Sequence, residues 1–337
     1  MNKILSVCIP SYNMEAYLSR NIDSFIAASE VLEKLEIIIV NDGSKDHTLD
    51  IANSYKALYP DSIIVIDKPN GHYGSCVNAS LKIATGKYFR IVDADDWVDP
   101  KALITVIRTL ENVDADVVYT QYSTYRETDG RAHLEEDASE MKWNQLLCLN
   151  DFIFNKYLHM HQLTYRLNLL IRINYRQTEG VCYTDTEYDF IPFVNAQSIY
   201  CIPVSLYQYY VGREDQSMAP EVIASNFKHL YKVLDSIVNY IPKDVNANYA
   251  FQRKTYIDAL LGYIIDAIFI NYGENDEWNV LLRNMFDKLL SQGVDLSNYW
   301  ERKFWGLSWI YLLYKNDLLS RLKLKLLFSA LKIRKAF

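Results

Sequence analysis

The first 120 residues or so alternate between short apolar runs and amphipathic segments, and this alternation limits the fold more than any other feature. It predicts an α/β fold in which helices flank a mostly parallel sheet. The predicted strands are residues 4–9, 35–40, 63–67, 87–92 and 115–121. The predicted helices are residues 15–28, 46–58 and 75–84, and a fourth that begins near Pro100.

Polar loops follow four of these strands, around Ser11, Asp42, Asn70 and Asp93. In an open α/β sheet, ligands bind in the crevice outside the carboxyl ends of the strands. We therefore expect the four loops to converge on one binding crevice.

The fourth of these loops contains three carboxylates, in the segment Asp93-Ala94-Asp95-Asp96. A buried strand that leads into Asp-x-Asp holds the carboxylates rigidly, and hard oxygen ligands suit Mg²⁺ or Mn²⁺. Such an ion leaves its other positions to water and substrate phosphates. Because Asp-x-Asp is common, the motif alone leaves a second interpretation open, namely a solvated acidic turn before a helix that Asp99 caps.

Composition and charge narrow the class of protein. Half of the 337 residues are hydrophobic, as in an ordinary globular protein, and the net charge of −7 argues against a nucleic-acid partner. The five cysteines show no paired spacing, and no apolar run reaches the length of about 18 residues that predicts a membrane span. The apolar run at the N-terminus is too short for a signal peptide, so we expect a cytoplasmic protein.

The pattern changes after about residue 125. We expect an exposed loop or hairpin at 127–140, helices at 143–158 and 163–173, and a last strand at 198–210. Beyond 219 the strand signals end and apolar residues recur at helical spacing. We predict one domain at 1–218 and a helical C-terminal region at 219–337.

The tail, residues 302–337, has its own character. It carries nine Lys or Arg against one Asp, and two tryptophans precede an alternation of Leu with Lys. A basic, apolar helix can lie on the surface of an anionic membrane. The same apolar face can pack on the preceding domain or on another subunit. Peripheral membrane contact and homo-oligomer contact therefore both remain open.

Three motifs, in their order and spacing, resemble those of family 2 glycosyltransferases with the GT-A fold. They are Val7-Cys8-Ile9-Pro10-Ser11-Tyr12-Asn13, Asn41-Asp42-Gly43-Ser44 and Asp93-Ala94-Asp95-Asp96. The resemblance covers about residues 1–215. It implies a GT-A (Rossmann-like) catalytic domain, with a nucleotide-binding half at about 1–122 and an acceptor-binding half at about 123–218.

The first two motifs supply the expected contacts to a UDP-sugar donor. Tyr12 can stack on the uracil while Pro10 and Ser11 shape the turn, although Tyr12 could instead pack on the next helix. Asp42 can accept the uracil N3–H, and Gly43 lets the backbone approach closely. Asp42 as a helix cap is the alternative.

Further donor contacts follow from the resemblance. It implies that Asn70 and Asn78 contact the base and ribose, with Lys68 near the nucleotide. Arg213 lies in a segment that resembles the family's loop after the last core strand, so we expect it to reach the diphosphate.

The third motif supplies the expected metal site. The resemblance implies that Asp93 lies beside the ribose or the metal, and that Asp95 binds a Mn²⁺ or Mg²⁺ that bridges the diphosphate. Ala94 lies between them at the donor, and Asp96 is expected to support them from behind. The ion would neutralise charge that builds on the departing UDP.

A catalytic base is expected near Asp185. The segment from Tyr183 to Tyr188 resembles the acidic pair that precedes an aromatic helix in the family, with Thr184 where Glu is usual. Asp185 aligns with the base, Glu187 is second choice, and a helix N-cap is the structural alternative. A single displacement aided by such a base inverts the anomeric centre.

The segment His159-Met160-His161 could hold a metal if it formed a strand, because residues i and i+2 share a strand face. No cysteine or carboxylate lies nearby in the sequence. We therefore expect the stretch as far as Arg166 to line an acceptor pocket, as the equivalent region does in the family.

The expected function is that of an inverting, metal-dependent hexosyltransferase. The donor would be a UDP-sugar (glucose, galactose or N-acetylglucosamine), and the acceptor a hydroxyl of a surface polysaccharide or a protein-linked glycan. One alternative is a non-catalytic nucleotide-sugar-binding or scaffold subunit of a glycan-assembly complex. A nucleotidyltransferase is less favoured, because a Gly-rich triphosphate loop is missing near the first strand.

Overall fold

The computed structural model describes residues 2–126, 131–135, 141–212, 220–271, 277–294 and 315. The chain forms two compact units, one of residues 1–213 with 241–252 and one of residues 214–240 with 253–337. Arg213 and, apart from Lys315, the basic tail lie outside the described residues. The functional domain boundary at 218 stays a prediction.

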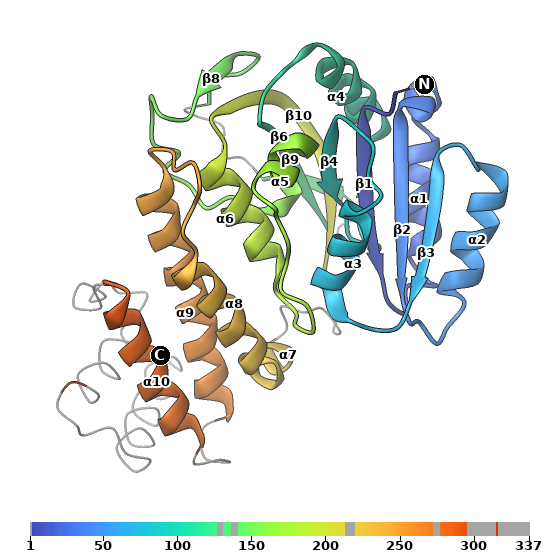
Figure 1. Ribbon diagram of the computed structural model, residues 1–337. Coiled ribbons are helices and arrows are strands. Elements are labelled where there is room, and N and C mark those ends of the chain that lie inside the picture. Colours follow the sequence, from blue (N-terminus) through green and yellow to red (C-terminus); the bar gives the residue numbers. More distant parts are fainter. Residues whose placement is uncertain are drawn as a thin grey trace. The chain divides into compact units, whose positions relative to one another are not determined.

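A mixed sheet forms the centre of the first unit (Figure 1). Its described strands lie in the order β3-β2-β1-β4-β9-β6-β10-β5, with β7 paired to β6 and β8 paired to β10. Four strands make a parallel half: β1 (Leu5–Ser11), β2 (Leu35–Asp42), β3 (Ile63–Lys68) and β4 (Tyr88–Ile91). The carboxyl ends of these parallel strands therefore lie at one edge, as the sequence pattern predicts.

The other half of the sheet mixes parallel and antiparallel pairs. Its strands are β5 (Trp97–Val98), β6 (Val117–Arg126), β7 (Arg131–Leu134), β8 (Leu146–Cys148), β9 (Leu163–Arg166) and β10 (Ser198–Val211). Here β6 and β10 run parallel, whereas β9 is antiparallel to both β4 and β6. β9 thus joins the two halves into one sheet.

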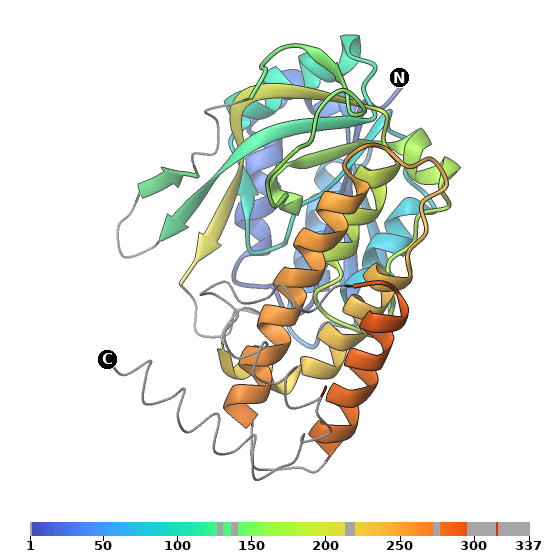
Figure 2. The same ribbon diagram turned by 90° about the vertical axis from the view of Figure 1, so that its left-hand side faces the viewer.

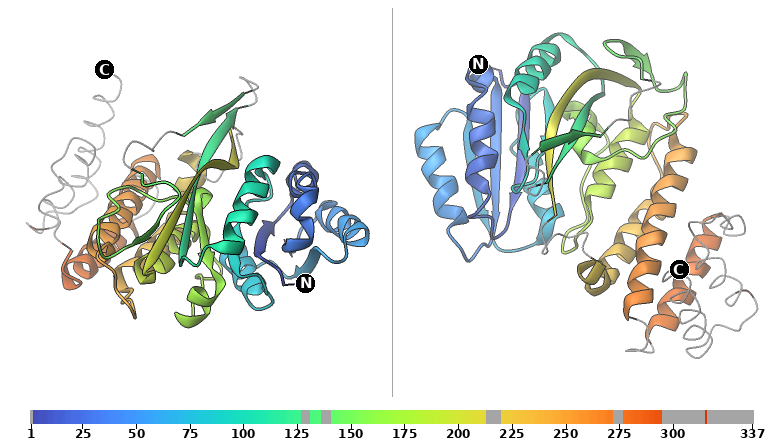
Figure 3. Two further views of the ribbon diagram at one scale, coloured as in Figure 1. Left: turned by 90° about the horizontal axis from the view of Figure 1, so that it is seen from above. Right: turned by 180° about the vertical axis from the view of Figure 1, so that it is seen from behind.

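Helices cover both faces of the sheet (Figures 1 and 3). One face carries α1 (Leu18–Ile26), α2 (Thr48–Leu58) and α4 (Pro100–Asn112), and the other carries α3 (His72–Leu81), α5 (Leu167–Arg172) and α6 (Asp185–Asn195). Two 3₁₀ turns, η1 (Ser29–Lys34) and η2 (Met160–Gln162), complete the unit. Because helices pack on both sides, all residues of β2 are buried, which explains its continuous apolar run.

The predicted helix at 143–158 is wrong, and the one predicted at 163–173 is confirmed only for its second part. Residues 146–148 form β8, residues 163–166 form β9, and only 167–172 are helical. Tyr165 pairs with Phe89 of β4 and with Val117 of β6, two strands far away in the sequence. Tertiary pairing therefore overrides the local helical spacing of the apolar residues.

Strands β6 and β10 are long and curved, and Figure 2 shows them running side by side. Their register shifts between Ile202 and Ser205 and again between Ser205 and Tyr207. Such irregularities bend a strand and redirect its side chains. The shifts set which face of the sheet Tyr207 and the residues after it occupy.

The second unit is helical. It contains α7 (Pro220–Ser225), α8 (Phe227–Asn239), most of α9 (Tyr249–Asn271) and α10 (Glu277–Ser291). An ion pair joins Lys288 to Asp235, and the Arg253 guanidinium donates to the Val238 carbonyl oxygen at 2.9 Å. In the ranges that the structure describes, every helix is too short or too polar to cross a lipid bilayer.

Candidate functional site

The loops after β1 and β2 hold each other in place. The Asn13 N–H donates to Ser44 Oγ at 3.0 Å, and the Lys45 N–H donates to Asn13 Oδ1 at 2.9 Å. The Glu15 N–H adds a third bond, to Asp46 Oδ2 at 3.1 Å. A loop whose backbone donors are satisfied by a neighbouring loop is fixed before any ligand arrives.

The predicted donor residues of β1 lie on this fixed loop. Tyr12 is 43% exposed, so its ring is accessible for stacking. Ser11 is buried and its hydroxyl donates to the Ile9 carbonyl oxygen at 3.2 Å, and Pro10 lies in register with Val40 of β2. Of these positions, Tyr12 alone presents a large side chain to a ligand.

Asp42 collects the polar groups of the next two loops. Its Oδ1 accepts bonds from Lys68 Nζ and, at 2.9 Å, from the Gly71 N–H. Asn70 Nδ2 donates to the Asp42 carbonyl oxygen at 2.9 Å. Gly43 has a φ of +71°, and a Cβ there would lie 3.0 Å from the Asn70 backbone nitrogen, so this close contact requires glycine. The structure thus brings Asp42, Gly43, Lys68 and Asn70 together.

Asn78 lies apart from this group. It is buried in α3, where its Nδ2 donates to the Gln177 carbonyl oxygen and to Glu179 Oε1, both at 2.9 Å. Its Oδ1 accepts the Gln177 N–H at 2.9 Å. These bonds fix the segment that leads toward Asp185 against α3.

Gly74 allows the segment around Thr178 to pack closely against α3. A Cβ at Gly74 would lie 2.2 Å from the Thr178 carbonyl oxygen, which no side chain can tolerate without movement. Two residues after Thr178, the Gly180 N–H donates to the Gly71 carbonyl oxygen at 2.9 Å. Gly71 therefore connects Asp42 on one side with the 177–180 segment on the other.

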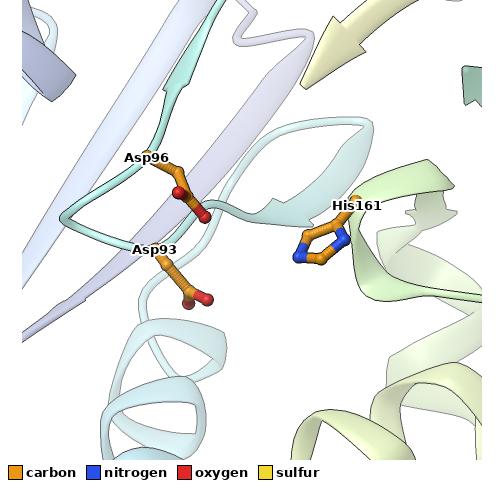
Figure 4. A group of neighbouring side chains, drawn as sticks. All are labelled: Asp93, Asp96 and His161. Carbon is orange, nitrogen blue, oxygen red and sulfur yellow. The ribbon is translucent and has the colours of Figure 1, made fainter. Parts of the chain in front are cut away.

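Asp93, Asp96 and His161 form the group that could hold a metal ion. Their ligand atoms all lie within 4.8 Å of one another. Figure 4 shows both carboxyl groups and one edge of the imidazole facing the same space. Asp95 is not part of this group, but its charge raises the pKa of Asp96, so its carboxylate lies close by. Ala94, 2% exposed, contributes only backbone to the site.

The Asp96 carboxylate is held by the sheet. It is 1% exposed and accepts bonds from the Tyr207 hydroxyl and, at 2.7 Å, from the Tyr210 N–H. Burial, followed by the charges of Asp95 and Asp93, raises the pKa of Asp96 well above its usual range. Since each Asp96 oxygen already accepts a strong bond, Asp96 suits the supporting role expected from the sequence.

The Asp93 carboxylate lies beside that of Asp96, and both are directed toward His161. The Tyr73 hydroxyl donates to Asp93 Oδ1 at 2.8 Å, and the Asp93 N–H donates to the Tyr207 hydroxyl oxygen at 3.2 Å. Neither tyrosine stands out in the sequence, which contains 27 of them. These two phenols orient the carboxylate loop from both sides.

Helix α1 fixes the backbone of the same loop. Asn21 Nδ2 donates to the carbonyl oxygens of Asp93 and Asp96, both at 2.9 Å. Arg20 Nη2 donates to the Asp95 carbonyl oxygen at 2.7 Å. With three carbonyl oxygens bonded, the loop has little freedom to rearrange, and the carboxylates are preorganised.

His161 corrects one expectation. It lies in the turn η2 rather than on a strand, and two carboxylates distant in the sequence are its neighbours. Burial lowers the pKa of His161 well below its usual range, as do His159 and Arg90 to a smaller extent. A neutral imidazole offers a lone pair to a metal. Within the described part of the chain, His161 Nδ1 is buried without a hydrogen-bond partner.

This donor set fits a divalent cation. Carboxylate oxygens suit Mg²⁺ and Mn²⁺, and an imidazole is a softer ligand than Mg²⁺ prefers. The set therefore favours Mn²⁺ over Mg²⁺.

Asp185 is the first residue of α6, after the N-cap residue Thr184. Burial raises the pKa of the Asp185 carboxyl group, the property expected of a base that works near neutral pH. Burial and then the charges of Asp93 and Asp185 raise the pKa of Tyr73. Both acids therefore act electrostatically on the Tyr73 hydroxyl, and Asp93 also accepts its hydrogen bond at 2.8 Å.

Glu187, the second choice for the base, has a structural role. Its two carboxylate oxygens accept the Thr178 N–H and the Thr178 hydroxyl, both at 2.7 Å, and the residue is 1% exposed. Buried between such donors, Glu187 holds the 177–180 segment and leaves Asp185 as the candidate base.

The sheet combines a parallel half, whose carboxyl edge is polar, with a mixed half. The segments next to the mixed half carry His161 and Asp185. This arrangement defines a GT-A fold with a preorganised acidic site. The chain belongs to glycosyl transferase family 2, whose family model matches residues 6–173.

Similar proteins are found among curated sequences and solved structures. The uncharacterized glycosyltransferase EpsJ of Bacillus subtilis is 30% identical over 232 residues, which are 66% of this chain and 64% of EpsJ. Glycosyltransferase GlyA of Streptococcus pneumoniae is 29% identical over 126 residues, 37% of this chain and 18% of GlyA. The chain thus spans less than two thirds of either relative.

The structure of S. aureus TarS 1–349 in complex with UDP has a TM-score of 0.64 and 15% identity, covering 98% of this chain and 91% of that one. The mannosyltransferase PcManGT from Pyrobaculum calidifontis, in complex with GDP-Man and Mn²⁺, has a TM-score of 0.53 and 14% identity, covering 90% and 88%. These similarities show the shared fold.

Proposed function

We propose that this protein is an inverting, metal-dependent glycosyltransferase. It moves a hexose, namely glucose, galactose or N-acetylglucosamine, from a UDP-sugar to a hydroxyl of a surface polysaccharide or a protein-linked glycan. The observation that carries the proposal is the meeting of Asp93, Asp96 and His161, whose ligand atoms lie within 4.8 Å of one another, beside the Tyr73 hydroxyl. Two fold relatives with bound nucleotide sugars, TarS with UDP-GlcNAc and PcManGT with GDP-Man, support a nucleotide-sugar donor.

The donor nucleotide binds at the edge of the parallel half. Asp42 accepts the uracil N3–H, Tyr12 stacks on the base, and Lys68 and Asn70 contact the nucleotide beside it. The bonds among these residues hold them in position before the donor arrives. Two sequence-based candidates, Asn78 and Arg213, stay as predicted contacts.

Asp93 from the loop after β4 and His161 from η2, both in the group of Figure 4, would hold the metal ion. Asp95 of the same loop would join them, as the resemblance to the family implies. Asp96 supports the loop through Tyr207 and Tyr210. A bound divalent ion supplies Lewis-acid stabilisation of the charge that develops on the UDP leaving group.

Asp185 acts as the general base. As the acceptor oxygen forms its bond to the anomeric carbon, the bond from that carbon to UDP breaks and the acceptor proton moves to the Asp185 carboxylate. Attack opposite the leaving group inverts the configuration. The positive end of α6 stabilises the ionised carboxylate at its first turn, while burial keeps its proton affinity high.

The tail at 302–337 adds a proposal from the sequence alone, that it contacts an anionic membrane surface or another subunit.

The test is UDP release by the purified chain across the common UDP-sugars, with Mn²⁺, with Mg²⁺ and with a chelator. We expect turnover that needs the ion, and a fall of about 10²–10⁴-fold in Asp185→Asn. A near wild-type rate in Asp185→Asn would contradict the mechanism. Binding of UDP and Mn²⁺ without turnover on any acceptor would favour the scaffold role instead.

A further inference from the structure

A row of aromatic rings passes through His161. We call the following five residues the ring row: Tyr209, His161, His159, Tyr122 and Tyr157. The centroid of the His161 ring lies 4.6 Å from that of Tyr209, 5.1 Å from Tyr122 and 6.0 Å from His159. The His159 centroid lies 4.8 Å from that of Tyr157. The proposed chemistry uses only His161 from this row.

The ring row is anchored in rigid parts of the fold. Tyr122 lies on β6 and Tyr209 on β10, and Tyr122 is in register with Tyr207, two positions before Tyr209 on the same face of the sheet. The His159 side chain accepts the Gln162 N–H, and the His159 N–H donates to Gln162 Oε1 at 3.2 Å. A ligand that binds here therefore finds the rings already ordered, which lowers the entropy cost of binding.

The chemistry of the rings fits a carbohydrate. All five side chains are partly exposed, whereas Tyr207 beneath them is fully buried. A sugar ring has an apolar face of C–H groups and a rim of hydroxyls, and tyrosine and histidine pair an apolar ring face with polar atoms at the edge. Because one His159 nitrogen accepts a backbone N–H, its other ring nitrogen is the donor in the neutral ring.

The position of the row points to the acceptor rather than the donor. Its rings come from β6, β10 and the segment before β9, in the half of the sheet that does not carry Asp42. One end meets the acidic site, because the Tyr209 ring lies 4.6 Å from that of His161, whose ligand atom lies within 4.8 Å of those of Asp93 and Asp96. Those negative charges disfavour a polyanion.

We propose that the ring row is an extended acceptor site that binds at least two further sugar units of a neutral glycan, beyond the sugar that receives the hexose. The site rests on the proposed function, since His161 sets one end of the row at the place of transfer. Successive ring centroids from Tyr209 to Tyr157 lie 4.6 to 6.0 Å apart, close enough for consecutive sugar units to contact consecutive rings. The other end of the row, at Tyr157, holds the unit farthest from the transfer site.

The test measures binding of glycan probes to the full chain in the presence of UDP and Mn²⁺. The probes are tagged mono-, di- and trisaccharides of glucose, galactose and N-acetylglucosamine. We expect affinity to rise with chain length, and Tyr157→Ala to lower trisaccharide affinity by about three- to tenfold while monosaccharide affinity stays unchanged. Tyr157→Phe keeps the ring and should restore trisaccharide binding.

Tyr200 provides a matched control, because it is another partly exposed tyrosine on β10, near the start of the strand. Tyr200→Ala should bind the trisaccharide as the wild type does. Three results would each refute the ring row as an acceptor site. They are an affinity that does not depend on glycan length, equal losses in Tyr200→Ala and Tyr157→Ala, and no binding of any probe.

UDP binding and UDP release separate this result from the proposed function. A wild-type chain that binds and hydrolyses a UDP-sugar but shows no dependence on glycan length refutes the ring row alone. A chain that neither binds UDP nor releases it from any donor, yet binds the trisaccharide through Tyr157, refutes the transferase and keeps the glycan site.

Discussion

The two edges that meet at the site are built from different interactions. On the donor side, Asp42 and its neighbours are fixed by hydrogen bonds between consecutive loops of the parallel half. On the acceptor side, His161 lies among aromatic rings from β6 and β10. Directional polar bonds suit one invariant ligand such as a nucleotide, whereas ring faces accept related sugars. Under the proposed function, donor choice is therefore fixed in the loops and acceptor choice in the sheet.

The largest expected effect separates two neighbouring acids on the donor side. Asp95→Asn should abolish Mn²⁺-dependent UDP binding and lower transfer by about 10³-fold, because a metal ligand contributes several kcal/mol. Its thermal stability should stay near that of the wild type, since the Asp95 side chain is partly exposed. Calorimetric titration with Mn²⁺ and thermal unfolding check both statements.

Asp96→Asn is the matched variant with the opposite expectation. The Tyr207 hydroxyl and the Tyr210 N–H would lose a buried carboxylate acceptor, so stability should fall by about 1–3 kcal/mol. If Asp96→Asn lost Mn²⁺ affinity at unchanged stability while Asp95→Asn kept it, the metal ligand would be Asp96, one of the group in Figure 4.

The next prediction concerns the contact between Gly74 of α3 and Thr178, in the segment that leads to Asp185. In Gly74→Ala the new Cβ would meet the Thr178 carbonyl oxygen at 2.2 Å, so the segment leading to Asp185 must move. Misplacing a catalytic group by about 1 Å can cost about 10²-fold in rate. We expect kcat to fall by that order while UDP affinity, which the proposed function assigns to Asp42 and its neighbours, changes little. Steady-state kinetics show this, and an unchanged kcat would mean that the contact does not position the base.

A smaller effect tests the phenol between the two edges. Tyr73→Phe removes the hydroxyl that donates to Asp93 and should lower transfer by about tenfold, the usual value of a hydrogen bond to a charged group. Tyr88→Phe is the control, because among the described residues the Tyr88 hydroxyl bonds to backbone groups, at Val113 and Ala115. Equal losses of activity in the two variants would show that Tyr73 contributes to folding rather than to the site.

The smallest effect is a shift in pH dependence on the acceptor side. Since burial raises the pKa of Asp185, the carboxyl group keeps its proton to a higher pH than the ordinary value of about 3.9. Only the ionised form accepts the acceptor proton, so kcat/KM should fall as the pH drops through this raised pKa. The same shift stabilises the fold at low pH, and that contribution is lost as the pH rises through the folded-state pKa.

The pH profile of kcat/KM checks this expectation. An acid limb near the ordinary pKa of an exposed aspartate, or a limb that persists unchanged in the residual activity of Asp185→Asn, would show that another group titrates.

The donor edge was largely predictable from the sequence. Strands β1 to β4 are continuous apolar runs that end in polar loops, so both the sheet and the meeting of Asp42 with Asn70 follow from local pattern. The N-cap at Asp99 was equally predictable from the sequence, and its side chain accepts the Ala102 N–H at 2.8 Å. Local rules suffice where a structure is built from neighbours in the chain.

The acceptor edge was not predictable in the same way. β9 is a strand only because it pairs with β4 and β6, which lie far away in the sequence, and its own spacing suggested a helix. His161 gains its carboxylate neighbours through that pairing. Tyr73 and Tyr207 are two of 27 tyrosines, and only the folded geometry distinguishes them.

The most direct test of a single site shared by the two edges is a crystal structure with UDP and Mn²⁺, with the ion located by anomalous scattering. We predict uracil at Asp42, the ion at about 2.0–2.3 Å from ligand atoms of the Asp93–Asp95 loop and His161, and Asp185 facing the sugar position from the other side. An ion bound away from that loop, or Asp185 directed away from the diphosphate, would contradict the account.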